Sequence, residues 1–252
     1  MKMQLALALT LALVPPPASA ACRLALALAL DVSRSVDEEE YQLQTGGLAE
    51  ALGDPDVRAA LFAFPEAPVS LAIYEWSSEH YQRLILDWTP VGTEAELAAV
   101  RARLGGWKRQ PAPESTGIGA ALVYGAGLIG RGPDCWDRTL DVSSDGENNS
   151  GPVPERVRAE GRTAGFRINA LVVGNPYEER AVLSWNGEAQ LTAYFKANVI
   201  QGPDAFVEVA YGYRNFAAAM QRKLMREIGG RPIGGLPPLP PAGRAGDRLA
   251  RQ

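Results

Sequence analysis

Apolar runs and amphipathic segments alternate along most of the chain. The apolar run 24–30 stops abruptly at Asp31, which is typical of a central strand that is buried on both faces. Beyond a polar loop, the acidic residues 37–40 begin a segment in which apolar residues recur at helical spacing, until residues 53–55 end the pattern. We therefore expect a strand, a polar loop and a helix, in that order.

Two segments rich in aromatic and β-branched residues, 69–76 and 81–88, are separated by a short polar link and predict a hairpin. One edge strand is therefore expected to be antiparallel. Similar patterns predict strands at 138–144, 166–173 and 205–210, and helices at 93–104, 117–129, 153–162, 190–199 and 215–228. Because strands and helices of these lengths alternate, we expect an α/β fold, a doubly wound and mostly parallel sheet with helices on both faces.

The N-terminus has the pattern of a secretory signal peptide. Lys2 precedes the apolar residues 5–14, and three prolines are followed by Ala18-Ser19-Ala20, which predicts cleavage after residue 20. A membrane anchor is the alternative, but about ten apolar residues fall short of the roughly 20 that cross a bilayer. A lipid-modified Cys22 also stays open. We expect an exported protein, periplasmic or secreted.

The remainder of the chain divides into one domain and a tail. Residues 21–228 carry the alternating elements, whereas 229–252 are rich in Gly and Pro and predict a disordered tail, with a polyproline ligand as the alternative. No other long apolar segment occurs, so stable membrane insertion of the mature chain is not expected. The net charge of −4 provides no basic field for a phosphate backbone, which argues against nucleic acid as a partner.

Candidate metal ligands follow the predicted strands. Asp31, Ser33 and Ser35 come directly after the first strand, and their alternating spacing can point three oxygens to one side of an extended loop. Thr116 precedes a small-residue helix, and Asp145 follows the strand 138–144. Oxygen ligands suit Mg²⁺, with Mn²⁺ or Ca²⁺ as alternatives, whereas one His and two Cys cannot build a zinc site. Taken alone, Asp-x-Ser-x-Ser is also typical of a helix cap or turn.

These motifs together resemble the metal-ion-dependent adhesion site of von Willebrand factor A domains. The resemblance implies that Ser33, Ser35 and Thr116 are hydroxyl ligands, and that Asp31 and Asp145 are the charge-neutralising carboxylates. It also implies a non-enzymatic, adhesion-type module whose protein partner presents an acidic side chain to the metal.

The resemblance extends over most of the mature chain. Glu75-Trp76-Ser77 and the closing segment 222–228 are similar to those of exported bacterial A-domain proteins of unknown function. Ser144 stands where many A domains have Thr, at a position that is not a ligand in that family.

Two cysteines, Cys22 and Cys135, are the number expected of one disulfide in an oxidising compartment, with unpaired buried thiols as the alternative. In A domains the first and fourth strands are neighbours. The resemblance thus implies that both cysteines lie at the end of the sheet opposite the metal face and can pair.

Enzyme functions have weaker support. The chain has no Gly-x-Ser-x-Gly, and its single His80 lies in the predicted hairpin link, where we expect it to be solvated. A metal-dependent hydrolase or phosphatase using Asp31 remains the alternative, although such enzymes usually carry a second Asp where this chain has Ser33.

Overall fold

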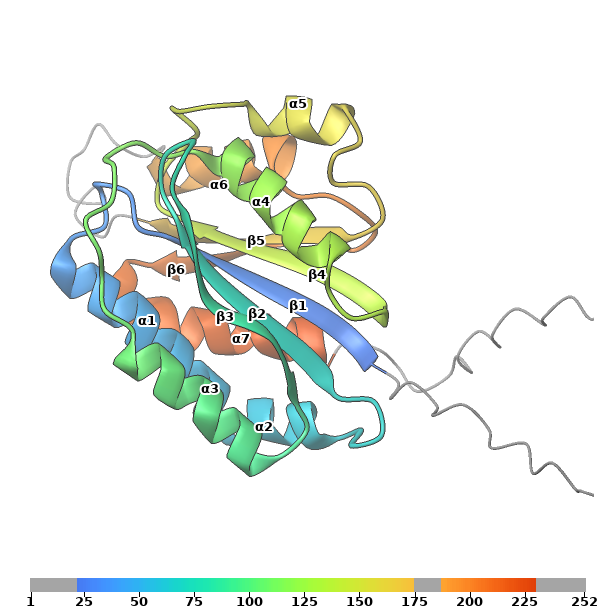
Figure 1. Ribbon diagram of the computed structural model, residues 1–252. Coiled ribbons are helices and arrows are strands. Elements are labelled where there is room, and N and C mark those ends of the chain that lie inside the picture. Colours follow the sequence, from blue (N-terminus) through green and yellow to red (C-terminus); the bar gives the residue numbers. More distant parts are fainter. Residues whose placement is uncertain (1–21, 175–186, 230–252) are drawn as a thin grey trace, which may run out of the picture.

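A six-stranded sheet forms the centre of the molecule, which is described by a computed structural model for residues 22–174 and 187–229 (Figure 1). The strand order is β3-β2-β1-β4-β5-β6, and β3 runs antiparallel to β2 at one edge. The strands are β1 (Cys22–Asp31), β2 (Val69–Trp76), β3 (Gln82–Val91), β4 (Cys135–Ser144), β5 (Arg167–Gly174) and β6 (Val207–Tyr211). The helices are α1 (Glu38–Gly53), α2 (Pro55–Phe62), α3 (Glu94–Gly106), α4 (Ile118–Gly130), α5 (Pro154–Ala159), α6 (Gly187–Asn198) and α7 (Phe216–Ile228). This arrangement confirms the predicted doubly wound fold with one antiparallel edge strand.

Helices cover both faces of the sheet. Figure 1 shows α1, α2, α3 and α7 on one face and α4, α5 and α6 on the other. The even-numbered leucines of β1 pack in the core on the α1 and α7 side, whereas Ala27 and Ala29 pack on the α4 side. The α4 side has little spare room, because a Cβ added at Gly125 would lie 2.7 Å from a methyl carbon of Leu140. The small residues of α4 thus allow the helix to approach the sheet closely.

The strand order places the candidate site. β1 pairs with β2 on one side and with β4 on the other, both in parallel. The carboxyl ends of β1 and β4 therefore lie side by side at the same edge of the sheet. Strand order reverses at this point, and the crevice beyond it is where ligands bind in doubly wound folds.

Two helices differ from their sequence-based predictions. The residues 53–55 end α1 but also begin α2, which the hydrophobic pattern did not reveal. Asp54 caps α2 by accepting hydrogen bonds from Asp56 and Val57, and Pro55 occupies the first turn. The helix expected over 153–162 is shorter, because α5 ends at Ala159 and is soon followed by Gly161, which has a φ of 72°.

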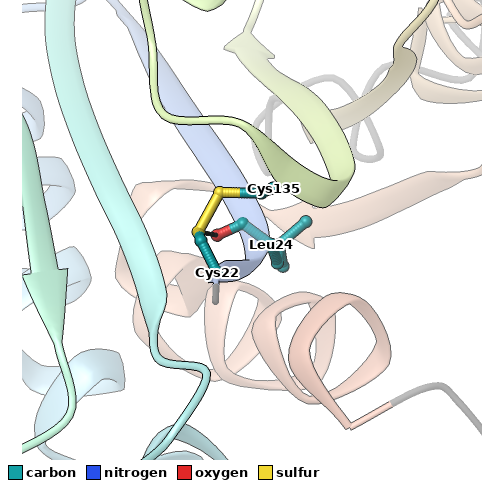
Figure 2. Close-up of a disulfide and its surroundings, with 3 residues drawn as sticks. All are labelled: Cys22, Leu24 and Cys135. Carbon is teal, nitrogen blue, oxygen red and sulfur yellow. Dashed lines mark hydrogen bonds between the residues drawn. A yellow bond between two sulfur atoms is a disulfide. The ribbon is translucent and has the colours of Figure 1, made fainter. Parts of the chain in front are cut away.

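Cys22 and Cys135 form a disulfide at the amino-terminal end of the sheet (Figure 2). The two residues are directly paired in the parallel register of β1 and β4, with Cα atoms 4.4 Å apart. The two cysteines are separated by 113 positions in sequence. In the chain-entropy model, closing a loop of about this length stabilises the folded state by about 4–5 kcal/mol. The pairing expected from the two cysteines is confirmed.

A charged cluster lies under the middle of the sheet. The Lys223 Nζ lies 2.9 Å from Asp141 Oδ2 and 2.5 Å from Glu227 Oε1, and the three side chains are at most 2% exposed. Asn169 donates a hydrogen bond of 2.7 Å to Glu227 Oε1. We call Lys223, Asp141 and Glu227 the buried lysine cluster. It ties α7 to β4, and Asn169 extends the connection to β5.

Candidate metal centre

The loop after β1 is a tight turn. Asp31 ends the strand, and its Oδ1 accepts a hydrogen bond of 2.8 Å from the Ser33 backbone N–H. The Val36 N–H closes the turn on the Ser33 carbonyl at 3.1 Å. The prediction of an extended loop is therefore wrong, because a carboxylate at this position competes for the following backbone N–H groups. The turn still brings the Oγ atoms of Ser33 and Ser35 within 3.3 Å of each other.

Oxygen atoms from three loops meet at this edge of the sheet. Thr116 Oγ1 donates to Ser33 Oγ at 3.3 Å, and Ser35 Oγ donates to Asp145 Oδ1 at 2.6 Å. Asp31 joins the same network through its bond with the Ser33 backbone. All five residues that the sequence marked as ligands are therefore brought together.

The loop after β4 holds Thr116 in place. The Asn149 side chain accepts a hydrogen bond of 2.8 Å from the Thr116 N–H, and the Asn149 N–H donates to the Thr116 carbonyl at 2.9 Å. The next residue, Gly117, donates its N–H to the Ser77 carbonyl at 2.6 Å. A Cβ at Gly119 would lie 1.9 Å from the Pro152 carbonyl oxygen, so glycine is required for this close approach. Backbone contacts thus bring Thr116 to the Asp145 loop.

A buried carboxylate anchors the start of the segment that leads to Thr116. Glu75 is 1% exposed and accepts hydrogen bonds from Trp107 Nε1 at 3.0 Å, from the Tyr41 hydroxyl at 3.1 Å and from the Tyr81 hydroxyl at 3.0 Å. Trp107 directly follows α3. Three neutral donors therefore stabilise the Glu75 carboxylate and link α1, β2, the turn before β3 and the segment after α3.

The two aspartates of the site carry perturbed pKa values. Asp31 is fully buried, and its burial together with the neighbouring charge of Asp145 raises its pKa to about 7. Hydrogen bonds from Ser144 and Ser33 act in the opposite direction but do not outweigh burial. Burial also raises the pKa of Asp145. Within the described residues, no Lys or Arg forms an ion pair with either carboxylate, so the negative charge of the pair is uncompensated there.

The donor set fits a hard divalent cation. The site supplies two carboxylates and three hydroxyls, and such oxygen ligands suit Mg²⁺, Mn²⁺ or Ca²⁺. No cluster of three or more His, Cys, Asp or Glu side chains suited to a metal occurs in the described ranges, so neutral hydroxyls must complete any metal shell here. A bound cation would also offset the uncompensated charge of Asp31 and Asp145.

Sequence reasoning missed three contributors to the site. Ser144 donates a short hydrogen bond to Asp31 Oδ2, although its position is not a ligand position in A domains. Asn149 positions Thr116, and Tyr213 lies next to Asp145, whose charge helps to raise the Tyr213 pKa. Ser144 could have been found from its place beside Asp145, whereas no local pattern marks Tyr213. His80, expected to be solvated, is exposed over 89% of its side chain.

Solved structures with a similar fold include a mussel matrix protein, a pilus adhesin and a von Willebrand factor type A protein. Proximal thread matrix protein 1 from the mussel byssus matches with a TM-score of 0.55 and 14% identity over 83% of this chain and 47% of its own. The pilus adhesin SpaC from Lactobacillus rhamnosus GG has a TM-score of 0.56 and 12% identity, with coverages of 83% and 30%. A von Willebrand factor type A protein from Catenulispora acidiphila has a TM-score of 0.52 and 16% identity, with coverages of 83% and 43%. This chain spans less than half the length of each, and the fold is that of a von Willebrand factor A domain.

The chain belongs to the family described as "Protein of unknown function (DUF1194)", whose model matches residues 21–232. A search of curated proteins found no match. Another structure of the mussel protein is described as having a zinc-occupied MIDAS motif, which refers to a metal-ion-dependent adhesion site, and it matches with a TM-score of 0.55 and 16% identity over 83% of this chain and 46% of its own.

Proposed function

We propose that this protein is an exported binding module that engages a protein partner through a divalent metal ion. Asp31, Ser33, Ser35, Thr116 and Asp145 hold the ion in this proposal. The observation that carries it is the meeting of two carboxylates, one buried and one half-buried, with three hydroxyls and no protein cation among the described residues. Burying such a charge is costly unless a cation compensates it.

The metal supplies a positive charge to which an acidic side chain of the partner binds. Mg²⁺ is the first choice, since it prefers oxygen ligands and commonly shares its coordination sphere with waters or ligand oxygens. Mn²⁺ and Ca²⁺ are alternatives. The zinc-occupied site of the mussel protein supports a divalent ion at this place in the fold without naming the ion for this chain.

The surroundings of Asp31 favour binding over hydrolysis. A phosphatase of the aspartyl-phosphate type needs an accessible carboxylate as its nucleophile. Asp31 is 0% exposed, and its two oxygens accept hydrogen bonds from Ser33 and Ser144. This arrangement suits a carboxylate held for a cation better than one that attacks a substrate.

Export of the protein is part of the proposal. The disulfide is expected of an oxidising compartment, and the described helices include none that is long and apolar enough to cross a bilayer. The predicted signal peptide, residues 1–20, lies outside the described residues, as does the tail from residue 230 onward. We keep 21–228 as the domain that carries the function.

Calorimetry tests the metal site. Titration with Mg²⁺ and with Mn²⁺ should show binding to the wild-type protein and none to Asp31→Ala, because the variant lacks a central carboxylate. Asp87→Ala is the matched control, since Asp87 is an exposed carboxylate of β3 that pairs with Arg131. Absence of binding in the wild-type protein would remove the basis of the proposal.

A capture experiment tests the partner. The immobilised protein should retain an exported protein in Mg²⁺ and release it in EDTA, whereas immobilised Asp31→Ala should retain none. Retention that is equal in Mg²⁺ and EDTA would contradict metal-bridged binding. A phosphatase assay on the same preparations separates the alternative, which requires turnover that depends on Asp31.

A further inference from the structure

Tyr213 brings a fourth chain segment to the metal centre. It begins η2 (Tyr213–Asn215), the short turn between β6 and α7. Gly212 precedes it with a φ of 79°, a backbone conformation that favours glycine. The Tyr213 ring stacks on Phe216 with centroids 6.3 Å apart and an angle of 16° between the planes. The sharp turn and the stacked ring together fix the direction of the hydroxyl.

The Tyr213 hydroxyl is a buried donor that makes no hydrogen bond in the described part of the chain. The residue is 6% exposed, and its hydroxyl has no hydrogen-bond partner of ordinary geometry in the described part of the chain. Burial raises its pKa well above the usual value, and the charges of Asp145 and Asp31 raise the pKa further. In return, the hydroxyl lowers the pKa of Asp145, although burial has the larger and opposite effect. The Tyr213 hydroxyl and the Asp145 carboxylate therefore lie close enough to affect each other, although no hydrogen bond joins them. Buried donors are rarely left unsatisfied, so this one calls for a functional explanation.

We propose that Tyr213 is a positioning residue of the metal site, whose hydroxyl donates a hydrogen bond to the Asp145 carboxylate in the metal-bound protein. This inference rests on the proposed function, since it requires a bound ion. One oxygen of Asp145 already accepts from Ser35, and Tyr213 supplies a second donor without adding a charge. Donors of this kind fix the orientation of ligating carboxylates, and their loss typically weakens metal binding by about 10–100-fold.

The substitution Tyr213→Phe in the full chain tests this role, because it removes the hydroxyl and keeps the ring that stacks on Phe216. Tyr74→Phe is the matched control. Tyr74 is also buried, but its hydroxyl donates to the Ala121 carbonyl at 2.7 Å, on the other face of the sheet. Calorimetric titration with Mg²⁺ and Mn²⁺ gives the affinity of each variant, and thermal unfolding in EDTA gives its stability without metal.

We expect Tyr213→Phe to bind both ions at least about 10-fold more weakly than the wild-type protein. Its thermal midpoint in EDTA should be equal or higher, because no completed hydrogen bond is lost. Tyr74→Phe should show the reverse, with unchanged affinity and a lower midpoint. The electron paramagnetic resonance spectrum of bound Mn²⁺ should also change in Tyr213→Phe alone, since it reports the arrangement of ligands around the ion.

Wild-type affinity in Tyr213→Phe would overturn the inference while leaving the proposed metal site intact. Equal weakening in both variants would also overturn it, since the effect would then come from altered packing. If the wild-type protein binds neither ion, the proposed function fails first and the inference fails with it.

Discussion

Two pairs of carboxylates in this molecule differ in what balances their charge. Asp141 and Glu227 contact Lys223, so the chain itself supplies a cation to them. Asp31 and Asp145 have hydroxyls around them but no ion pair with a cation of the described residues. Burial raises the pKa of Asp31 and of Asp141 to about 7. The cost of burying negative charge is therefore met by a lysine at one pair, whereas only hydroxyls surround the other pair.

The difference separates a structural cluster from a candidate binding site. The buried lysine cluster lies beneath the sheet and joins α7 to β4, where an internal cation can satisfy both acids. The Asp31 and Asp145 pair lies at the carboxyl edge of the sheet, where Asp145 is partly exposed to solvent. Carboxylates whose negative charge is not compensated by the chain, at the edge of the sheet where ligands bind in this fold, are suited to bind a cation.

Removal of the internal cation should have the largest effect. Lys223→Met leaves Asp141 and Glu227 buried without a cation, and we expect a loss of about 3–5 kcal/mol in the free energy of unfolding. Lys196→Met is the control, because Lys196 is exposed and should change stability by less than about 0.5 kcal/mol. Urea unfolding gives both values. A loss in Lys223→Met as small as that of the control would mean that the cluster does not hold the fold together.

The pH dependence of stability should contain a contribution from Asp141 that a substitution can isolate. Its pKa is about 7 in the folded protein because of burial, compared with 3.8 ordinarily, so the folded state keeps a proton that the unfolded chain releases. Stability from this group should therefore fall as pH rises from about 4 to 7 and level off above 7, by at most about 4 kcal/mol. Asp141→Asn should flatten this part of the curve in urea unfolding at a series of pH values. Parallel curves for the two proteins would show that Asp141 does not titrate in this range.

Metal addition should stabilise only the pair that lacks an internal cation. At a Mg²⁺ concentration 100 times its dissociation constant, the gain from binding is about 2.7 kcal/mol. We expect this gain in the wild-type protein and in Asp141→Asn, and no gain in Asp31→Ala, as measured by urea unfolding in Mg²⁺ and in EDTA. A gain that survives Asp31→Ala would place the ion elsewhere.

The exposed cation on the metal loop should matter least. Arg34 Nη1 lies 2.5 Å from Glu114 Oε2, but the two side chains are 72% and 69% exposed, and such pairs contribute less than about 1 kcal/mol. Arg34→Ala should therefore leave stability in EDTA nearly unchanged, as thermal unfolding can measure. If it destabilised the protein as strongly as Lys223→Met, Arg34 would be the balancing cation and the contrast between the two pairs would disappear.

Local patterns predicted most of the fold. The apolar run before Asp31, the hairpin and the alternation of strands and helices were sufficient for the doubly wound sheet. They did not reveal α2, because a single turn signal at 53–55 ends one helix and begins the next. They also predicted too long a helix at α5, because the turn at Gly161 depends on a positive φ that glycine permits but does not require.

The sequence predicted which residues form the candidate site, but it did not predict the conformation of the loop that carries them. Asp31, Ser33 and Ser35 were expected to lie on an extended loop, whereas a side-chain-to-backbone bond folds them into a turn. Ser144 and Tyr213 have no ligand signature. The contact of Ser144 with Asp31 follows from the pairing of β1 with β4, and the place of Tyr213 near Asp145 follows from long-range packing.

The sequence by itself determined the elements, their order and the types of oxygen available, because hydrophobic periodicity and turn residues act over a few positions. Only the tertiary structure decided which carboxylates meet a lysine and which remain unbalanced. That outcome depends on the pairing of β1 with β4 and on the packing of α7 against the sheet, which join residues far apart in the chain. Burial then makes charge expensive, and the position of each pair determines whether the compensating cation can come from the chain or must come from solvent.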